Sequence, residues 1–228
     1  MKDGELFALD FDHHAGWLFF DRHLIANVDV FLENWYTPQI ATNLAGYGLT
    51  VNAGKAQIKG LEAQVQAVLP AGFDLSMNAA YIDAKFVEDS AISGYPKGTA
   101  IPDTPKFSGS AVLQWKRSLA SGSTLFGSLE DAYTGGRTDL PFGVTATLQT
   151  MDSLLVHLPS YNLLNFRLGL RGEKDSGSRW SAALFVRNLA NKHVLIDPQP
   201  QIGLQTGAYA RYIISQPLTA GLDVSYAW

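Results

Sequence analysis

The sequence contains five histidines, the residue type that most often binds metals or acts as a general base near neutral pH. They are His13, His14, His23, His157 and His193. His13 and His14 are adjacent, so on an extended strand their side chains point to opposite faces, and no carboxylate stands at a spacing that would complete a metal site. The sequence therefore predicts no metal centre and no cofactor.

Nucleophilic catalysis has no signature either. The chain has no cysteine, which excludes cysteine nucleophiles, thiolate metal sites and disulfides. Serine, histidine and aspartate are all present, but no Gly-x-Ser-x-Gly turn accompanies them. We expect no catalytic residues and no enzyme activity.

A second group of polar residues lies at alternating positions of extended segments. Their spacing places them on the polar faces of strands. They could line the path of a solute, since arginines attract anionic chelates, or they could form a water-facing wall held by structural ion pairs. These residues are Glu62, Gln64, Asn165, Arg167, Arg171, Arg187 and Asp223.

Strands must position these residues, because alternation of apolar and polar side chains dominates the chain and no stretch has helical periodicity. Leu164, Phe166 and Leu168, for example, alternate with Asn165 and Arg167. The expected strands are 5–20, 24–36, 54–69, 73–86, 106–116, 123–133, 160–171, 180–186 and 221–228. In the last of these, Leu222, Val224, Tyr226 and Trp228 share one face.

The connections between the expected strands alternate in length. Segments 21–23, 70–72, 117–122 and 172–178 are short, whereas 37–53, 87–105, 134–159 and the segment from 189 onward are long. Outer-membrane barrels have short turns at one end and long loops at the other. Residues 207–216 could form a further strand. Placing them in the last long segment, or in a protruding outer part of the final strand, keeps the alternation, so nine strands are expected.

Aromatic residues gather near the ends of these strands, as the interfacial girdle of a membrane barrel requires. The expected girdle residues are Trp17, Phe20, Trp35, Tyr36, Trp115, Tyr133, Trp180, Tyr226 and Trp228. Together with the strand pattern, they predict an all-β, antiparallel transmembrane barrel segment.

The composition sets further bounds. Charged residues make up 17% of the chain, against about 25% in typical soluble domains. The net charge of −4 argues against nucleic-acid binding, which needs a basic surface. No apolar stretch approaches the roughly 20 residues of a membrane helix, but barrel strands need only about 10 alternating residues.

Three stretches resemble the C-terminal half of a TonB-dependent outer-membrane receptor. The first is Asn52-Ala53-Gly54-Lys55-Ala56 with Gly60-Leu61-Glu62, similar to the N-x-G-x-A-x-x-x-G-x-E strand of that family. The second stretch is Leu163 to Leu170, then Trp180, and then Phe185-Val186-Arg187-Asn188-Leu189-Ala190-Asn191-Lys192. It is similar to the penultimate strand of that family with its Asn-Leu-x-Asn/Asp-Lys exit. The third is Pro217-Leu218-Thr219, which leads into the terminal strand, although Leu218 stands where arginine is frequent and Trp228 where phenylalanine is usual.

The resemblance implies a function and its partners. The chain would be the C-terminal part of a roughly 22-stranded barrel, with residues 1–228 forming barrel wall and the plug domain absent. Nine strands alone would leave open edges in lipid, at several kcal/mol for each unpaired backbone group. We therefore expect a fragment, unable to transport alone, of a Gram-negative outer-membrane receptor.

The complete receptor would take up a scarce large solute such as a ferric siderophore. Its expected partners are outer-membrane lipid, the solute, and the TonB system acting through the missing plug. Leu222, Val224, Tyr226 and Trp228 would form the terminal signal for barrel assembly. Two alternatives stay open: a soluble all-β binding module, such as a sandwich or lectin-like domain whose apolar faces meet each other, and an outer-membrane barrel enzyme.

Overall fold

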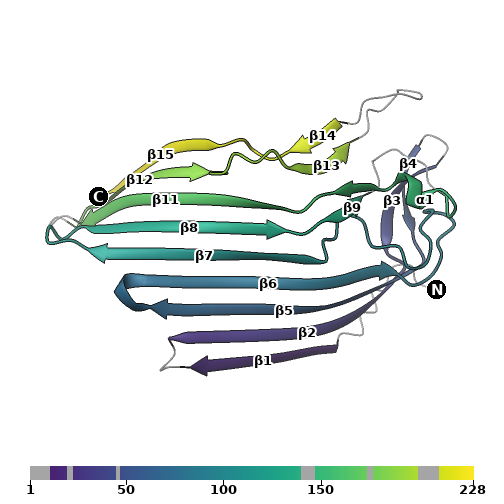
Figure 1. The fold of residues 1–228 in the computed structure, drawn as a ribbon, viewed down its shortest axis with the longest axis horizontal. Helices are drawn as coiled ribbons and strands as arrows, with labels where there is room; N and C mark the ends of the chain where they lie inside the picture. Colours follow the sequence, from purple (N-terminus) through teal and green to yellow (C-terminus); the bar gives the residue numbers. More distant parts are fainter. Residues whose placement is uncertain (1–10, 20–22, 45–46, 140–146, 174–176, 200–210) are drawn as a thin grey trace.

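Nine antiparallel strands form one sheet in which each strand pairs with its neighbours in the sheet order β1-β2-β5-β6-β7-β8-β11-β12-β15 (Figure 1). The computed structural model describes residues 11–19, 23–44, 47–139, 147–173, 177–199 and 211–228. The predicted nine strands and their antiparallel order are confirmed. They are β1 (Phe11–Phe19), β2 (Leu24–Tyr36), β5 (Lys55–Leu69), β6 (Phe73–Phe86), β7 (Phe107–Ser118), β8 (Thr124–Thr134), β11 (Tyr161–Glu173), β12 (Arg179–Arg187) and β15 (Thr219–Ala227).

The two ends of the sheet differ, as the lengths of the connections predict. At one end, β5 and β6 are joined by the 3₁₀ turn η1 (Pro70–Gly72), and the C-terminal Trp228 lies at this same end (Figure 1). At the other end, the long connections form short elements of their own. We call these the turn end and the loop end.

Three small hairpins and one short helix occupy the loop end. They are β3 (Gln39–Leu44) with β4 (Tyr47–Asn52), β9 (Arg137–Asp139) with β10 (Val156–Leu158), β13 (Leu195–Gln199) with β14 (Arg211–Ile214), and α1 (Met151–Leu154). Segment 37–53, expected as a loop, is therefore largely a hairpin. Residues 211–214 pair with β13 outside the main sheet, while 207–210, like 5–10 and Phe20, lie outside the described residues.

One face of the sheet carries large apolar side chains that remain exposed. Cross-strand partners share a face, and the register aligns Val30 with Leu61 and Leu61 with Tyr81. At the opposite edge, Leu222 is 65% and Val224 66% exposed. We call this the apolar face. A sandwich would bury such rows between its sheets, so the alternative of a soluble sandwich is wrong.

Aromatic rings border the apolar face at both ends. Phe73 and Trp115 lie 6.2 Å apart at the turn end, and Phe107 and Tyr133 lie 5.8 Å apart at the loop end. Phe73 and Tyr81 are eight residues apart on β6, about 27 Å along a strand. At the usual strand tilt of about 35–45°, this run covers about 20 Å of height, close to the roughly 25 Å apolar band of an outer-membrane barrel.

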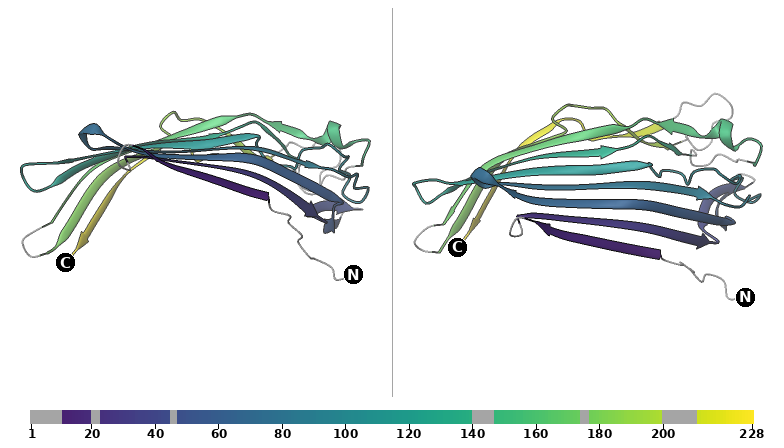
Figure 2. Two further views of the ribbon diagram at one scale, coloured as in Figure 1. Left: turned by 90° about the horizontal axis from the view of Figure 1, so that it is seen from below. Right: turned by 60° about the horizontal axis from the view of Figure 1, so that its bottom comes forward.

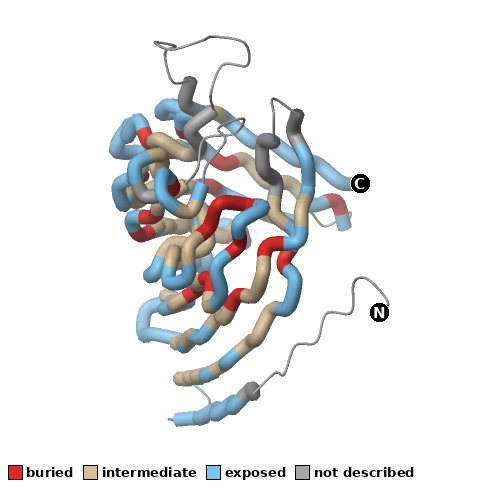
Figure 3. Tube along the Cα trace, turned by 90° about the vertical axis from the view of Figure 1, so that its right-hand side faces the viewer, coloured by how far each residue is buried: buried red, intermediate tan, exposed pale blue. Residues whose placement is uncertain are grey.

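The main buried apolar cluster lies at the loop end rather than within the sheet. Ala53, Ala56, Phe86, Tyr95 and Met151 are buried together, and the Phe86 and Tyr95 rings stack with centroids 4.7 Å apart. Figure 3, which faces the loop end, shows buried positions among these segments. Trp35 packs against this cluster, so its expected place in the girdle is wrong.

The sheet is curved, and its strands diverge in direction from one edge to the other (Figure 2). The described residues include no helix with the length and apolar character needed to cross a membrane.

Candidate functional site: the polar face of the sheet

The seven polar residues singled out from the sequence lie on the face opposite the apolar one. The register carries this face across the sheet: Gln64 stands opposite Asn78, and Asn78 opposite Ser110. Further along, Arg167 stands opposite both Ser128 and Phe185. We call this the polar face; it holds Glu62, Gln64, Asn165, Arg167, Arg171, Arg187 and Asp223.

Hydrogen bonds between side chains cross the polar face from strand to strand. Asn78 donates to Ser110 at 2.9 Å, and Ser181 and Ser225 share a hydrogen bond of 2.8 Å. Asn165 donates to Glu130 at 3.4 Å. Such pairs satisfy polar groups that face water and hold the strands in register.

A groove of about 540 Å³ opens on the polar face above β8, β11, β12 and β15. It gathers four of the predicted residues: Asn165, Arg167, Arg187 and Asp223. Arg167 donates to the Asp223 carboxylate at 2.7 Å, and both side chains are more than a third exposed. A pair of this kind adds only about 0.2–1 kcal/mol to stability, so it contributes mainly by orienting the two side chains.

Arg187 and Arg171, also on the polar face, lie near aromatic rings. The Arg187 guanidinium is 5.3 Å from the Phe185 ring centroid, and that of Arg171 is 5.6 Å from Phe126. A guanidinium at this distance from a ring face gains a cation–π attraction and still has five N–H donors for other partners. Arg171 borders a second groove nearer the turn end.

Glu62 and Gln64 lie away from this groove, on β5, four strands from β11 in the sheet order. Glu62 stands opposite Asp29, which contacts His14, and Gln64 accepts a hydrogen bond of 3.3 Å from Asn27. The polar face is therefore acidic around β2 and β5 and rich in arginine on β11 and β12.

The contact between His14 and Asp29 corrects the expectation that no carboxylate accompanies the histidines. The two residues meet across the β1–β2 pair, where His14 stands opposite Asp29. Within the described part of the chain, however, no three histidine, aspartate or glutamate side chains are grouped closely enough to hold a metal ion.

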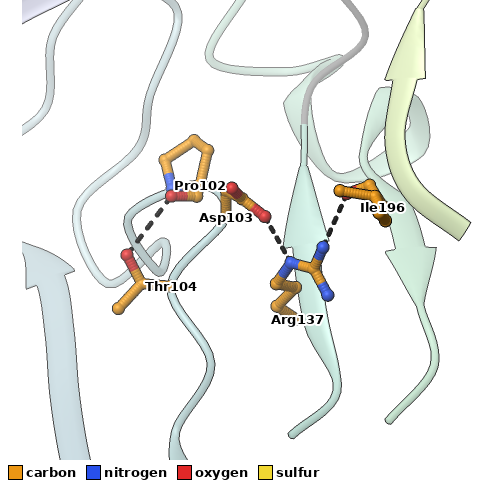
Figure 4. A network of polar contacts seen from close by, with 5 residues as sticks. All are labelled: Pro102, Asp103, Thr104, Arg137 and Ile196. Atoms are coloured by element: carbon orange, nitrogen blue, oxygen red, sulfur yellow. Dashed lines mark hydrogen bonds and ion pairs between the residues drawn. The ribbon is translucent and has the colours of Figure 1, made fainter. Parts of the chain in front are cut away.

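At the loop end, Arg137 joins three long connections (Figure 4). Its Nε donates to Asp103 in the β6–β7 connection, and one terminal nitrogen donates to the Ile196 carbonyl of β13 at 2.6 Å. Its guanidinium also lies 5.8 Å from the Tyr161 ring centroid. The Arg137 side chain is only 4% exposed, and its other terminal nitrogen has no partner. Sequence reasoning missed this residue.

A comparison with protein-family models matches residues 13–189 to the TonB dependent receptor-like, beta-barrel family. The chain belongs to the TonB-dependent receptor β-barrel family. The nine-stranded sheet, with its alternating short and long connections, is what a segment of a barrel in this family would form. The matched family is one of receptor barrels and not of enzymes, so the expectation of a non-enzyme is confirmed at the level of the family.

Solved structures of receptors and transporters for ferric complexes share this fold. The ferric yersiniabactin uptake receptor FyuA from Yersinia pestis matches with a TM-score of 0.67 and 18% identity, over 93% of this chain and 29% of that receptor. The ferric preacinetobactin receptor BauA from Acinetobacter baumannii gives 0.66 and 16%, over 94% and 29%. The ferric citrate transporter FecA gives 0.62 and 18%, over 93% and 30%.

This chain thus spans less than a third of each of these receptors. A search of curated protein sequences found no match.

In this TonB-dependent receptor chain, the exit motif that follows β12 has a structural role. The Asn188 side chain donates to the Lys192 and Gln216 carbonyls at 2.8 and 2.9 Å and accepts from the Lys192 backbone at 2.9 Å. Its own backbone N–H donates to Asn165 at 3.0 Å. Asn188 has a φ of 50°, which asparagine tolerates better than most residues. Asn165 is therefore partly engaged in this structural tie.

Proposed function

We propose that this chain supplies nine wall strands near the C-terminus of an outer-membrane receptor that imports a scarce large solute, such as a ferric siderophore, with energy from TonB. The proposal assigns residues 1–228 to the barrel wall and places the plug, through which TonB acts, outside this chain. One observation carries it: in a chain of this family, a single sheet exposes apolar rows on one face and hydrogen-bonded polar rows on the other.

Lipid is the solvent that suits the first face, because the aromatic borders and the exposed leucines and valines match the band of an outer-membrane barrel. Water suits the second. In this proposal Glu62, Gln64, Asn165, Arg167, Arg171, Arg187 and Asp223 face the lumen. The groove that holds Arg167 and Arg187 then forms part of the path of an anionic iron chelate.

The terminal strand has a separate role in the proposal. Leu222, Val224, Tyr226 and Trp228 present apolar groups on one face, with Trp228 at 97% exposure on the final residue. We assign them to the signal that directs barrel assembly. Trp228→Phe then keeps the receptor in the outer membrane, whereas Trp228→Ser lowers its level there.

Membrane fractionation and uptake measurements test this function. Antibody against the loop-end segment 90–105 locates the protein in separated outer and inner membranes. Uptake of iron-labelled siderophores is compared between cells with and without the receptor, each with and without TonB. Localisation in the outer membrane and TonB-dependent uptake support the proposal. A monomeric protein that stays in buffer without detergent would contradict it.

Within the receptor, Arg167→Gln and Arg187→Gln test the path. Both are expected to weaken uptake of anionic chelates while leaving the amount of receptor in the outer membrane unchanged. Lys116→Gln is the matched control, because Lys116 also lies on the polar face but pairs with Asp74 at the turn end. Equal uptake by all three variants would show that Arg167 and Arg187 do not take part in solute passage.

A further inference from the structure

Two lysines share one carboxylate on the apolar face near the loop end. Lys59 and Lys85 lie 3.5 and 3.0 Å from the same Asp83 oxygen. The register places Lys59 opposite Asp83, two residues from the exposed pair Leu61 and Tyr81 on the same face. The side chains of Lys59 and Lys85 are 56% and 41% exposed, so both ammonium groups remain accessible.

The aromatic residues at the loop end of the apolar face show where these lysines lie along the strands. Tyr81 stands opposite Phe107, whose ring lies 5.8 Å from that of Tyr133. Lys59 and Asp83 are one step beyond this border, on the side of the long connections. If the border marks the edge of the hydrocarbon, as aromatic girdles do, the ammonium groups lie at the level of lipid headgroups.

Further positive charge lies on the loop side of the border, where Lys55 is four residues from Lys59 along β5. Lys55 lies 4.4 Å from the Tyr36 ring centroid, and Lys192 contacts Asn162, which in turn bonds Asp131 at 3.0 Å. Asn162 stands opposite the border residue Tyr133. Among the described residues, this lysine strip comprises Lys55, Lys59, Lys85 and Lys192, set against Asp83 and Asp131.

The stability of the fold does not account for the strip. Exposed ion pairs contribute at most about 1 kcal/mol, and charge beside a lipid-facing surface carries a cost of its own. Ammonium groups at the headgroup level do attract phosphate, by about fivefold in affinity for each lysine near an anionic surface. Lysine is a compact donor of three hydrogen bonds to phosphate oxygens.

We propose that the lysine strip binds the phosphate groups of anionic lipids in the leaflet on the loop side, with Lys59 and Lys85 as its centre. This inference rests on the proposed function, because it needs the apolar face to lie in a membrane. The strip is a contact with the surrounding lipid, separate from the polar face and its groove.

Lipid binding is measured on the receptor extracted from outer membranes in detergent, with diphosphoryl lipid A as the probe and native mass spectrometry as the readout. The double variant Lys59→Gln/Lys85→Gln is expected to lose roughly fivefold in affinity for each lysine removed. Lys116→Gln, an ion-paired lysine on the other face at the other end, is expected to bind as the parent does.

Asp83→Asn separates lipid recognition from a structural role. If the lysines serve phosphate, removal of the competing carboxylate strengthens lipid A binding; if they serve only the ion pair, it does not. Parent-like binding by the double variant overturns the inference. So does complete displacement of lipid A by excess inorganic phosphate, which would indicate a site for free phosphate.

The experiment also separates this inference from the proposed function. Every variant is first checked for outer-membrane location and for the heat-dependent gel shift of a folded barrel. A receptor that passes both checks and binds lipid A independently of its lysines overturns only the lipid contact. A protein absent from the outer membrane overturns the proposed function instead.

Discussion

The Arg137 guanidinium forms an ion pair with the Asp103 carboxylate, 34 residues away in the sequence, and so joins the β6–β7 and β8–β11 connections. The backbone repeats the link, because the Asp103 N–H donates to the Thr138 carbonyl at 2.9 Å. With the bond from Arg137 to Ile196, the β6–β7, β8–β11 and β12–β15 connections are held together at one residue.

Arg137→Gln is therefore expected to loosen all three connections. The Ile196 carbonyl and the Asp103 carboxylate both lose a donor, at about 1–3 kcal/mol of local stability. Hydrogen exchange checks this: amides in 194–196 and 99–104 should exchange faster. Arg187→Gln, which alters an arginine of the sheet wall, is the control. Unchanged exchange in both segments would show that Arg137 does not join them.

Asn188 allows backbone strain to be separated from hydrogen bonding. Asn188→Ala removes the bonds to Lys192 and Gln216, at about 1–3 kcal/mol, and places alanine at a positive φ, at about 1 kcal/mol more. Asn188→Gly loses the same bonds without the strain. Urea unfolding in detergent should rank the parent above the glycine variant and the glycine variant above the alanine variant. Equal midpoints for all three proteins would show that the Asn188 hydrogen bonds do not stabilise the fold.

Gly221 lies directly beneath a phenylalanine ring on the polar face. A Cβ at Gly221 would approach the Phe185 ring to 2.5 Å, and the two residues are cross-strand partners. Gly221→Ala is expected to cost about 1–3 kcal/mol through overpacking. In the Phe185→Ala background, the same change should cost much less. Equal costs in the two backgrounds, measured by unfolding, would mean that the ring is not the obstacle.

The raised pKa of Tyr95 predicts that the stability of the loop-end cluster depends on pH. Burial, with a smaller contribution from the Asp139 charge, raises the pKa of Tyr95 to about 12. The unfolded chain loses this proton near its ordinary pKa of about 10, so the contribution of neutral Tyr95 to stability is complete below pH 10 and is lost between pH 10 and 12.

The measurement compares unfolding midpoints at pH 9 and 11 in the parent and in Tyr95→Phe. The parent should lose more stability than the variant over this interval, and phenolate absorbance should show the delayed ionisation of one tyrosine. A loss of the same size in both proteins would assign the pH dependence to other groups.

The strands were predictable because alternation of apolar and polar residues encodes a two-faced sheet directly. Leu164, Asn165, Phe166 and Arg167 lie on the faces that their positions in the sequence predict. The β3–β4 hairpin was missed because its glycines and asparagines are typical of loops. These two residue types also suit the tight turn of a hairpin.

Contacts between distant segments were harder to predict. The pairing of His14 with Asp29 depends on the register of the β1–β2 hairpin, and a shift of one residue would place His14 opposite Val30. Arg137 has partners in the β6–β7 connection, in β13 and at the start of β11, and these segments follow no common periodicity. Trp35 was misplaced because an aromatic residue near a strand end fits a girdle and a loop-end core equally well.

The cluster around Phe86 and Tyr95 is stabilised by burial within the chain, and in this it differs from the exposed apolar face of the sheet. The loop end holds its side chains away from solvent within the chain itself, whereas the exposed leucines and valines of the sheet need an outside medium to cover them. Transfer from a membrane into plain buffer should therefore destabilise the sheet, while the buried cluster at the loop end keeps its packing. The sheet and the loop end would then unfold as separate cooperative units.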